Sequence, residues 1–262
     1  MKIDYVSDLH INHHVRFNHN QTKWEQQTKL WTEKLMEKGT GDVLIVAGDF
    51  SEWNKQALWF LEVASLHYEH VLFGTGNHDR YLISKKQREK YGMSSNRIQE
   101  FLDEAAGIPH IVPMQQSVVT IDDVCFAGDG LWYRPLTPED FSFYMNNSND
   151  SVYIWEGLPI QETPEFLYRQ AMDWYRSLDG HPVDVMLSHV PPVHPPISPY
   201  PRNACYDCPV EFLVAPHWVC GHQHVQGDFQ VAGTTFHMNA LGYPSEQHLL
   251  ELRSFTLLKE AK

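Results

Sequence analysis

Residues 72–80 read LFGTGNHDR, an apolar run with strand character that ends in two glycines. An amide, an imidazole and a carboxylate follow at once, in Asn77, His78 and Asp79. A turn needs only Gly and Asn, since both tolerate left-handed backbone, and folding alone gives no reason for the other two residues. The carboxyl ends of strands are where α/β proteins build their sites, because loops converge there over a rigid scaffold. We therefore expect a functional site at the end of this strand.

Four other apolar runs end in polar clusters of the same kind. These clusters are Asp8-Leu-His10, Gly48-Asp49, Ser188-His189 and Gly221-His222-Gln-His224. Residues two apart in an extended segment point to the same face, so Asp8 and His10 can bind one ion together. Each motif alone could be an ordinary turn or polar surface. Their joint occurrence indicates an open metal site, because Asp and His hold Mn, Fe, Zn or Ni, whereas Cys-rich sets indicate structural zinc.

The order of apolar and amphipathic stretches predicts the fold class. Apolar runs predict strands at 3–6, 43–47, 71–73, 118–121, 124–127, 183–187, 218–220, 229–238 and 249–258. Helical spacing predicts helices at 21–38, 55–67, 96–106 and 165–178. Thr163 would be the N-cap of the last, and Thr137 opens a further short helix. Strands and helices alternate early and strands cluster later, which indicates an α/β fold with a mixed sheet or two packed sheets flanked by helices.

The chain has 262 residues, of which 42% are hydrophobic, enough for one α/β domain that buries most of its apolar surface. We expect a single domain over residues 1–262, although two small domains would also fit this length. The segment 133–162 is aromatic-rich and is punctuated by Pro and Asn, which indicates an insertion over one face. Its aromatic residues, and the Trp before it, could stack bases above a metal site or only pack the insertion: Trp132, Tyr133, Phe141, Phe143, Tyr144, Tyr153 and Trp155.

Charge and targeting signals limit the expected partners. The formal net charge is −13 and the acidic residues are scattered, so the overall field speaks against binding of duplex nucleic acid. Residues 1–7 begin as a strand without the features of a secretory signal, and no run of about 18 apolar residues occurs. We expect a soluble, cytoplasmic protein that does not contact a membrane.

Cys205 and Cys208 form a C-x-x-C without a second ligand pair, so we expect structural roles for both.

The ordered clusters resemble the signature of the calcineurin-like metallophosphoesterase superfamily. They are Asp8-x-His10, Gly48-Asp49, Gly76-Asn77-His78-Asp79, His189 and Gly221-His222-x-His224, and they span nearly the whole chain. Gly130-Leu-Trp132, Asn203-Ala204 and Asn239-Ala-Leu-Gly-Tyr-Pro-Ser-Glu246 resemble small bacterial and phage-type members more weakly. The resemblance implies two packed mixed β-sheets flanked by helices, a four-layer αββα sandwich, with two divalent transition-metal ions per chain.

The resemblance also implies a ligand set for each ion. One ion would be held by Asp8, His10, Asp49 and His224, and the other by Asp49, Asn77, His189 and His222. Asp49 would bridge the two, since a carboxylate has two oxygens and a charge that offsets two cations. The identity of the ions stays open among Mn, Fe, Zn and Ni.

The resemblance further implies the catalytic roles. A hydroxide shared by the two ions would attack phosphorus. His78 would assist the leaving group, and Asp79 would orient the His78 imidazole. Arg80 could contact the substrate phosphate or form a surface ion pair. Three further histidines would lie at the rim of the site: His13, His14 and His194.

The expected activity is two-metal hydrolysis of a phosphate ester, by a phosphodiesterase or monoesterase acting on a small or nucleotide-like substrate. A metal-dependent nuclease of the same superfamily is an alternative that the acidic balance and the lack of a basic and aromatic stripe weaken. A metal-bound scaffold without turnover is a second alternative, but it would have no need of His78. The substrate and the oligomeric state are left open.

Overall fold

The computed structural model describes residues 1–258, whose strands form two mixed sheets. The five-stranded sheet has the order β11-β1-β2-β3-β4 and the six-stranded sheet the order β5-β6-β7-β8-β10-β9. The first sheet contains β1 (Lys2–Val6), β2 (Val43–Ala47), β3 (His70–Gly74), β4 (Ile111–Pro113) and β11 (Arg253–Thr256). The second contains β5 (Ser117–Ile121), β6 (Val124–Gly128), β7 (Val185–Leu187), β8 (His217–Cys220), β9 (Gln226–Val231) and β10 (Thr234–Asn239).

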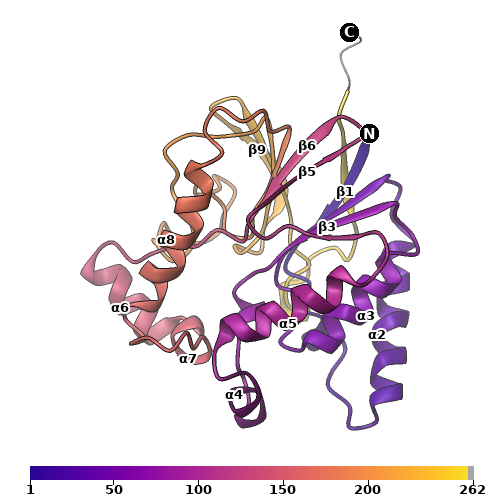
Figure 1. The fold of residues 1–262 in the computed structure, drawn as a ribbon, viewed down its shortest axis with the longest axis horizontal. Helices are drawn as coiled ribbons and strands as arrows, with labels where there is room; N and C mark the ends of the chain where they lie inside the picture. The colour runs from indigo at the N-terminus through magenta and orange to yellow at the C-terminus, as the bar shows by residue number, and fades with distance from the viewer. Residues whose placement is uncertain (259–262) are drawn as a thin grey trace.

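Helices cover the outer faces of the two sheets (Figure 1). The first half of the chain contributes α1 (Ile11–His14), α2 (Gln21–Met36), α3 (Asn54–Ala64), α4 (Lys85–Tyr91) and α5 (Ser94–Ala106). The second half contributes α6 (Pro138–Asn147), α7 (Asp150–Tyr153) and α8 (Thr163–Arg176). Two short 3₁₀ turns lie at His78–Arg80 and Pro244–Glu246.

Three apolar clusters separate four layers. In β2, alternate side chains point to opposite faces: Leu44 and Val46 pack under α2, α3 and α5, while Val43 and Ile45 pack between the sheets. The third cluster joins the outer face of the second sheet to α8, where Tyr175 is buried. The predicted sandwich of two mixed sheets flanked by helices is therefore confirmed.

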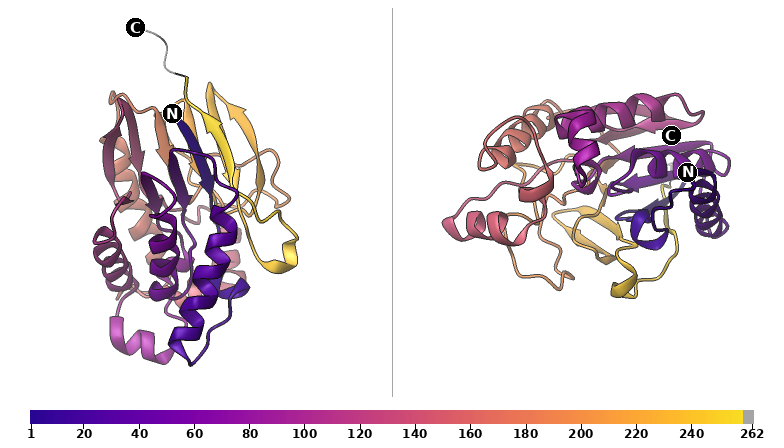
Figure 2. Two further views of the ribbon diagram at one scale, coloured as in Figure 1. Left: turned by 90° about the vertical axis from the view of Figure 1, so that its right-hand side faces the viewer. Right: turned by 90° about the horizontal axis from the view of Figure 1, so that it is seen from below.

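Both sheets turn the carboxyl ends of their central strands toward one region. Strands β1 to β4 are parallel, and so are β6, β7, β8 and β10, with antiparallel strands at three of the four edges. A parallel bridge between Ser7 and Ala240 links the two sheets just beyond β1 and β10. Strand β11 pairs with β1, so the two ends of the described chain lie together at the opposite end of the sheets (Figures 1 and 2). Within residues 1–258, no helix is long and apolar enough to cross a membrane.

Some predicted elements were wrong in extent. The run 229–238 is a hairpin of β9 and β10, in which Ala232 and Gly233 both have positive φ, as a type I′ turn requires. The run 249–258 is strand only over Arg253–Thr256. Thr163 is the first residue of α8, and Glu162 is its N-cap. The capping box that opens α6 at Thr137 is present as expected.

Candidate metal centre

All seven predicted metal ligands follow strands that end at the junction of the two sheets. Asp8 and His10 follow β1, and Asp49 and Asn77 follow β2 and β3. The ligands from the second sheet are His189 after β7 and His222 and His224 after β8. Most of these side chains are buried, and Asp8, His10 and His189 are fully inaccessible to solvent.

The backbone of this region is strained. Five of the seven residues have positive φ, namely Asp8 (50°), His10 (40°), Asp49 (58°), His222 (70°) and His224 (46°). Each such residue costs on the order of 1–3 kcal/mol unless its surroundings hold it in place. Backbone hydrogen bonds provide that support, since the amide of Asp8 donates to the carbonyl of Gly48 and that of His10 to the carbonyl of Asp49.

Two glycines let the strand ends approach the ligand carboxylates. A Cβ on Gly76 would lie 2.2 Å from Oδ1 of Asp49, and a Cβ on Gly221 would lie 2.6 Å from Oδ2 of Asp8. No side chain fits at either position without moving a buried carboxylate. Gly76 and Gly221 directly precede Asn77 and His222, and packing against the carboxylates of Asp49 and Asp8 explains why both positions are glycine.

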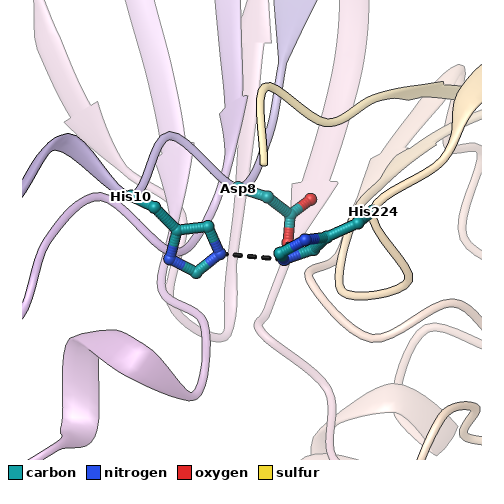
Figure 3. A group of neighbouring side chains, drawn as sticks. All are labelled: Asp8, His10 and His224. Atoms are coloured by element: carbon teal, nitrogen blue, oxygen red, sulfur yellow. Dashed lines mark hydrogen bonds and ion pairs between the residues drawn. The ribbon is translucent and has the colours of Figure 1, made fainter. Parts of the chain in front are cut away.

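The first group of converging atoms comes from Asp8, His10 and His224 (Figure 3). Nε2 of His10 lies 2.9 Å from Nε2 of His224, which is 3.7 Å from Oδ1 of Asp8. Nδ1 of His224 bonds the carboxylate of Glu246 at 2.7 Å, so Nε2 is the atom turned toward the group. Burial lowers the pKa of His224, but the bond to Glu246 and the negative charges of Asp8 and Glu246 together outweigh burial, so that the pKa is raised overall.

The second group comes from Asn77, His189 and His222. Oδ1 of Asn77 lies 3.0 Å from Nε2 of His189 and 3.1 Å from Nδ1 of His222. The other nitrogen of each ring donates to a carbonyl: His189 to Ala47 and His222 to Cys205. Burial lowers the pKa of both rings, to about 4 for His222, so each is neutral and turns a lone pair toward the Asn77 oxygen.

Three acceptor atoms thus face one another with no hydrogen between them. Nδ2 of Asn77 donates to Asp150, which fixes the amide with its oxygen toward the histidines. Acceptors at this separation repel unless a cation lies among them, and amide oxygen and imidazole nitrogen are ordinary ligands of divalent transition metals. The residues therefore fit a metal ion.

Asp49 lies between the two groups. Its Oδ2 is 3.7 Å from Nε2 of His10 and 3.5 Å from Nε2 of His189. Burial raises the pKa of Asp49, and the carboxylates of Asp79 and Asp8 raise it further. A bound cation would offset this clustering of buried negative charge.

His78 lies beside these groups, and Glu52 rather than Asp79 faces its ring. Oε1 of Glu52 is 3.4 Å from Nδ1 of His78, and the hydroxyl of Tyr243 is 3.3 Å from its Nε2. Burial raises the pKa of Glu52, but the neighbouring imidazoles of His13 and His78 outweigh burial and bring that pKa to about 2. The ring of His78 also lies close enough to His10 and Asp49 to join a metal-binding group.

The expected role of Asp79 is corrected by its contacts. Its carboxylate accepts backbone N–H bonds from Asp49 (2.8 Å), Phe50 (3.0 Å) and Gly76 (2.8 Å). Asp79 therefore holds the two ligand loops after β2 and β3 against each other. It stabilises the backbone of the site and does not orient the imidazole of His78.

Arg80 forms an ion pair and does not line the site. Its Nη1 lies 3.1 Å from Oε1 of Glu156, and its guanidinium lies over Trp132. The ion pair is mostly buried and does not lie on the surface, where the alternative placed it. Of the three expected rim histidines, His13 contacts Tyr243, as an edge-to-face pair.

The other two rim histidines have partners of their own. His14 stacks on Trp31 and bonds the carbonyl of Gly242. His194 faces Asp207 at 3.7 Å.

Sequence reasoning missed Glu52 and Asp150. Glu52 follows Asp49 by three residues, and this spacing is the one signal that could have indicated it. Asp150 begins α7 inside the segment 133–162, and its carboxylate bonds Asn77 at 2.8 Å, Tyr81 at 2.5 Å and Tyr133. Nothing local in the sequence distinguishes it from other acidic residues of that segment.

Comparison with known proteins shows the family of this chain. The family model described as calcineurin-like phosphoesterase matches residues 1–226. The chain belongs to this family. Among relatives of this calcineurin-like phosphoesterase, an uncharacterized protein of Acanthamoeba polyphaga mimivirus is 22% identical over 273 residues, 93% of this chain and 92% of that protein. The crystal structure of phosphopantetheinyl hydrolase from Mycobacterium tuberculosis has a TM-score of 0.69 at 17% identity, covering 97% of this chain and 95% of that chain, and shares the fold.

Proposed function

We propose that this calcineurin-like phosphoesterase is a phosphodiesterase that hydrolyses small or nucleotide-like esters with two divalent transition-metal ions. The observation that carries the proposal is the meeting of acceptor atoms from Asn77, His189 and His222 beside the buried carboxylate of Asp49. One ion would be held by Asp8, His10, Asp49 and His224, and the other by Asp49, Asn77, His189 and His222. When bound, two such ions supply a water of lowered pKa as nucleophile and positive charge for the phosphoryl oxygens.

His78 supplies the second part of the proposed reaction. Glu52 faces Nδ1 of the ring, which leaves Nε2, beside the Tyr243 hydroxyl, to give a proton to the leaving oxygen. A positioned acid of this kind contributes about 10²- to 10⁴-fold to the rate. His189 and His222 are unsuited to this role because their outer ring nitrogens donate to backbone carbonyls, which leaves lone pairs on the nitrogens that face Asn77.

The charge around the site supports a diester rather than a monoester. None of the described residues that line the cavity at the centre is Lys or Arg. A phosphomonoester carries a charge of about −1.5 to −2 at neutral pH, and the additional oxygen charge would meet no side-chain cation here. A diester carries a single negative charge, which the ions themselves can balance.

A substrate panel tests the proposal. The metal-free protein would be loaded in turn with Mn, Ni, Zn and Mg and assayed on a bis-aryl diester, an aryl monoester, a cyclic nucleotide, a phosphopantetheinyl ester and single-stranded DNA. We expect turnover of the small diesters only with added transition metal. Turnover of the monoester alone would reject the diester preference, and turnover of DNA alone would identify a nuclease.

A further inference from the structure

A cavity of about 220 Å³ opens directly beside the predicted metal ligands. Its floor includes Asn77 and His222, and its walls come from three segments that are distant in sequence: 143–150, 200–206 and 243–246. Sites for drug-sized ligands measure about 300–1,000 Å³, so this cavity suits one small group beyond the phosphate. One of these lining segments, 143–150, belongs to the predicted insertion 133–162.

One wall of the cavity is aromatic. The ring of Tyr206 stacks on Tyr200 at 5.3 Å and tilts against Phe143 at 5.7 Å, and it lies 6.2 Å from the ring of His222. Phe143 and Tyr206 are only half-buried and Tyr200 is exposed, so parts of these residues remain accessible in the cavity. By contrast, Trp132, Tyr133 and Tyr144 are buried and pack the segment. Accessible aromatic faces beside a phosphoester site are surfaces on which a planar group can stack.

Two amides flank the aromatic wall. Asn147 and Asn149 line the cavity and are exposed. Neither side chain has a hydrogen-bond partner among residues 1–258. A free amide offers a donor and an acceptor together, and the edge of a nucleobase presents the same pair. A simple aryl ring would offer neither amide a hydrogen-bond partner.

The charge of the cavity lining disfavours a second phosphate on the substrate. The described lining residues include the carboxylates of Asp150 and Glu246 but no Lys or Arg. Arg80 is paired with Glu156, and Arg202 lines a separate cavity. A second phosphate on the substrate would therefore meet carboxylates rather than cations.

We propose that this cavity binds a nucleobase, so that the substrate is the phosphodiester of a single nucleoside without a second phosphate. The base stacks against Tyr206 and Phe143, and its edge bonds Asn147 or Asn149. This inference rests on the proposed diesterase function, because the metal centre must hold the phosphate while the cavity holds the base. It gives the segment 133–162 a role in choosing the substrate.

Three esters that share one leaving group test the inference. Thymidine 5′-(p-nitrophenyl phosphate), its 3′-phosphate derivative and methyl p-nitrophenyl phosphate all release nitrophenolate, so differences in kcat/KM report the group that remains. We expect the thymidine ester to exceed the methyl ester by about 5- to 100-fold, the range that base stacking supplies. The added 3′-phosphate should remove most of that advantage.

Variants separate the base site from the metal site. Tyr206→Leu and Asn149→Ala should each lower the ratio of thymidine to methyl ester about 5-fold or more, whereas Phe17→Leu, an exposed aromatic residue outside this cavity, should leave it unchanged. Hydrolysis of all three esters at similar rates, with a ratio that Tyr206→Leu does not change, overturns the nucleobase inference alone. A metal-loaded protein that hydrolyses none of the esters overturns the proposed function and this inference with it.

Discussion

Changing Asp150 to Asn should weaken the binding of one metal ion and spare the other. The Asp150 side chain is 3% exposed and accepts from Nδ2 of Asn77 at 2.8 Å, so it determines which end of the Asn77 amide faces the histidines. In Asp150→Asn one acceptor oxygen becomes a donor. If that donor faces Asn77, the Asn77 amide must turn, and its NH₂ group then points at the lone pairs of His189 and His222.

The size of the effect follows from the bond that is lost. A hydrogen bond to a charged group contributes about 1.5–3 kcal/mol, which is about 10- to 150-fold in an equilibrium constant. If the new NH₂ group faces Tyr133 instead, the tyrosine hydroxyl can rotate and accept, and Asn77 keeps a weaker, neutral bond. That outcome sets the lower end of the range, so we expect the affinity for this metal ion to fall about 10- to 100-fold. The same range is typical when the partner of a metal ligand is removed.

Titration of the metal-free protein with Mn²⁺, followed by calorimetry, measures both affinities. The site formed with Asn77 should weaken in Asp150→Asn, and the site formed with Asp8 and His10 should keep its affinity. Glu139→Gln, an exposed acid-to-amide change in the same segment, is the matched control and should alter neither. If the folded Asp150→Asn protein binds two ions with unchanged affinity, Asp150 does not position Asn77.

The remaining predictions concern the proposed bridge, the acid, its carboxylate and the cysteines. Asp49→Ala should lose both ions, and elemental analysis that finds two metal equivalents in the folded variant would count against the bridge. His78→Asn should keep both ions, reduce turnover of an activated aryl diester only modestly and reduce turnover of an alkyl diester by about 10² or more; an equal loss on both substrates would mean that His78 stabilises the phosphoryl group instead. Glu52→Gln should show the same inequality between leaving groups in weaker form, since it removes the carboxylate that faces Nδ1 of His78; identical factors for the two substrates would exclude that role. The double change of Cys205 and Cys208 to Ser should leave metal content and turnover within a few-fold, and loss of one metal per chain would contradict the assigned ligands.

The fold could be predicted where periodicity and turn chemistry agree. Strands β1, β2, β3, β6, β7 and β8 are largely buried and each coincides with a predicted apolar run, and β2 (Val43–Ala47) matches its predicted range. The hairpin within 229–238 was missed because its turn begins with Ala232, a residue that seldom adopts positive φ, instead of Asn or Asp. Strand β4 (Ile111–Pro113) was missed because it has only three residues and ends in Pro, which an edge strand tolerates.

Some residues of the candidate site could likewise be predicted from the sequence and others could not. The predicted ligands follow apolar strands directly, so the topology of the sheets brings them together once the strands are recognised. The contacts of Asp79 and Glu52 were harder to predict. The loop geometry after β3 directs the Asp79 carboxylate to backbone amides, and Glu52 faces the imidazole of His78. Asp150 reaches Asn77 from 73 residues away, and no local pattern carries that information.

A glycine directly precedes the predicted ligands Asn77 and His222. The packing of the two sheets gives a physical reason for this pattern. Where the strands end, carboxylates of one loop must approach the backbone of the next, and a Cβ on Gly76 or Gly221 would collide with Asp49 or Asp8. Five of the seven predicted ligands have positive φ, at a cost that backbone hydrogen bonds such as those of Asp8 and His10 offset. A chain with these glycines, strained ligands and mutually facing acceptors is organised for a cation before it meets one. Short motifs could therefore predict which side chains meet at this junction, whereas the residues that support them must be found in three dimensions.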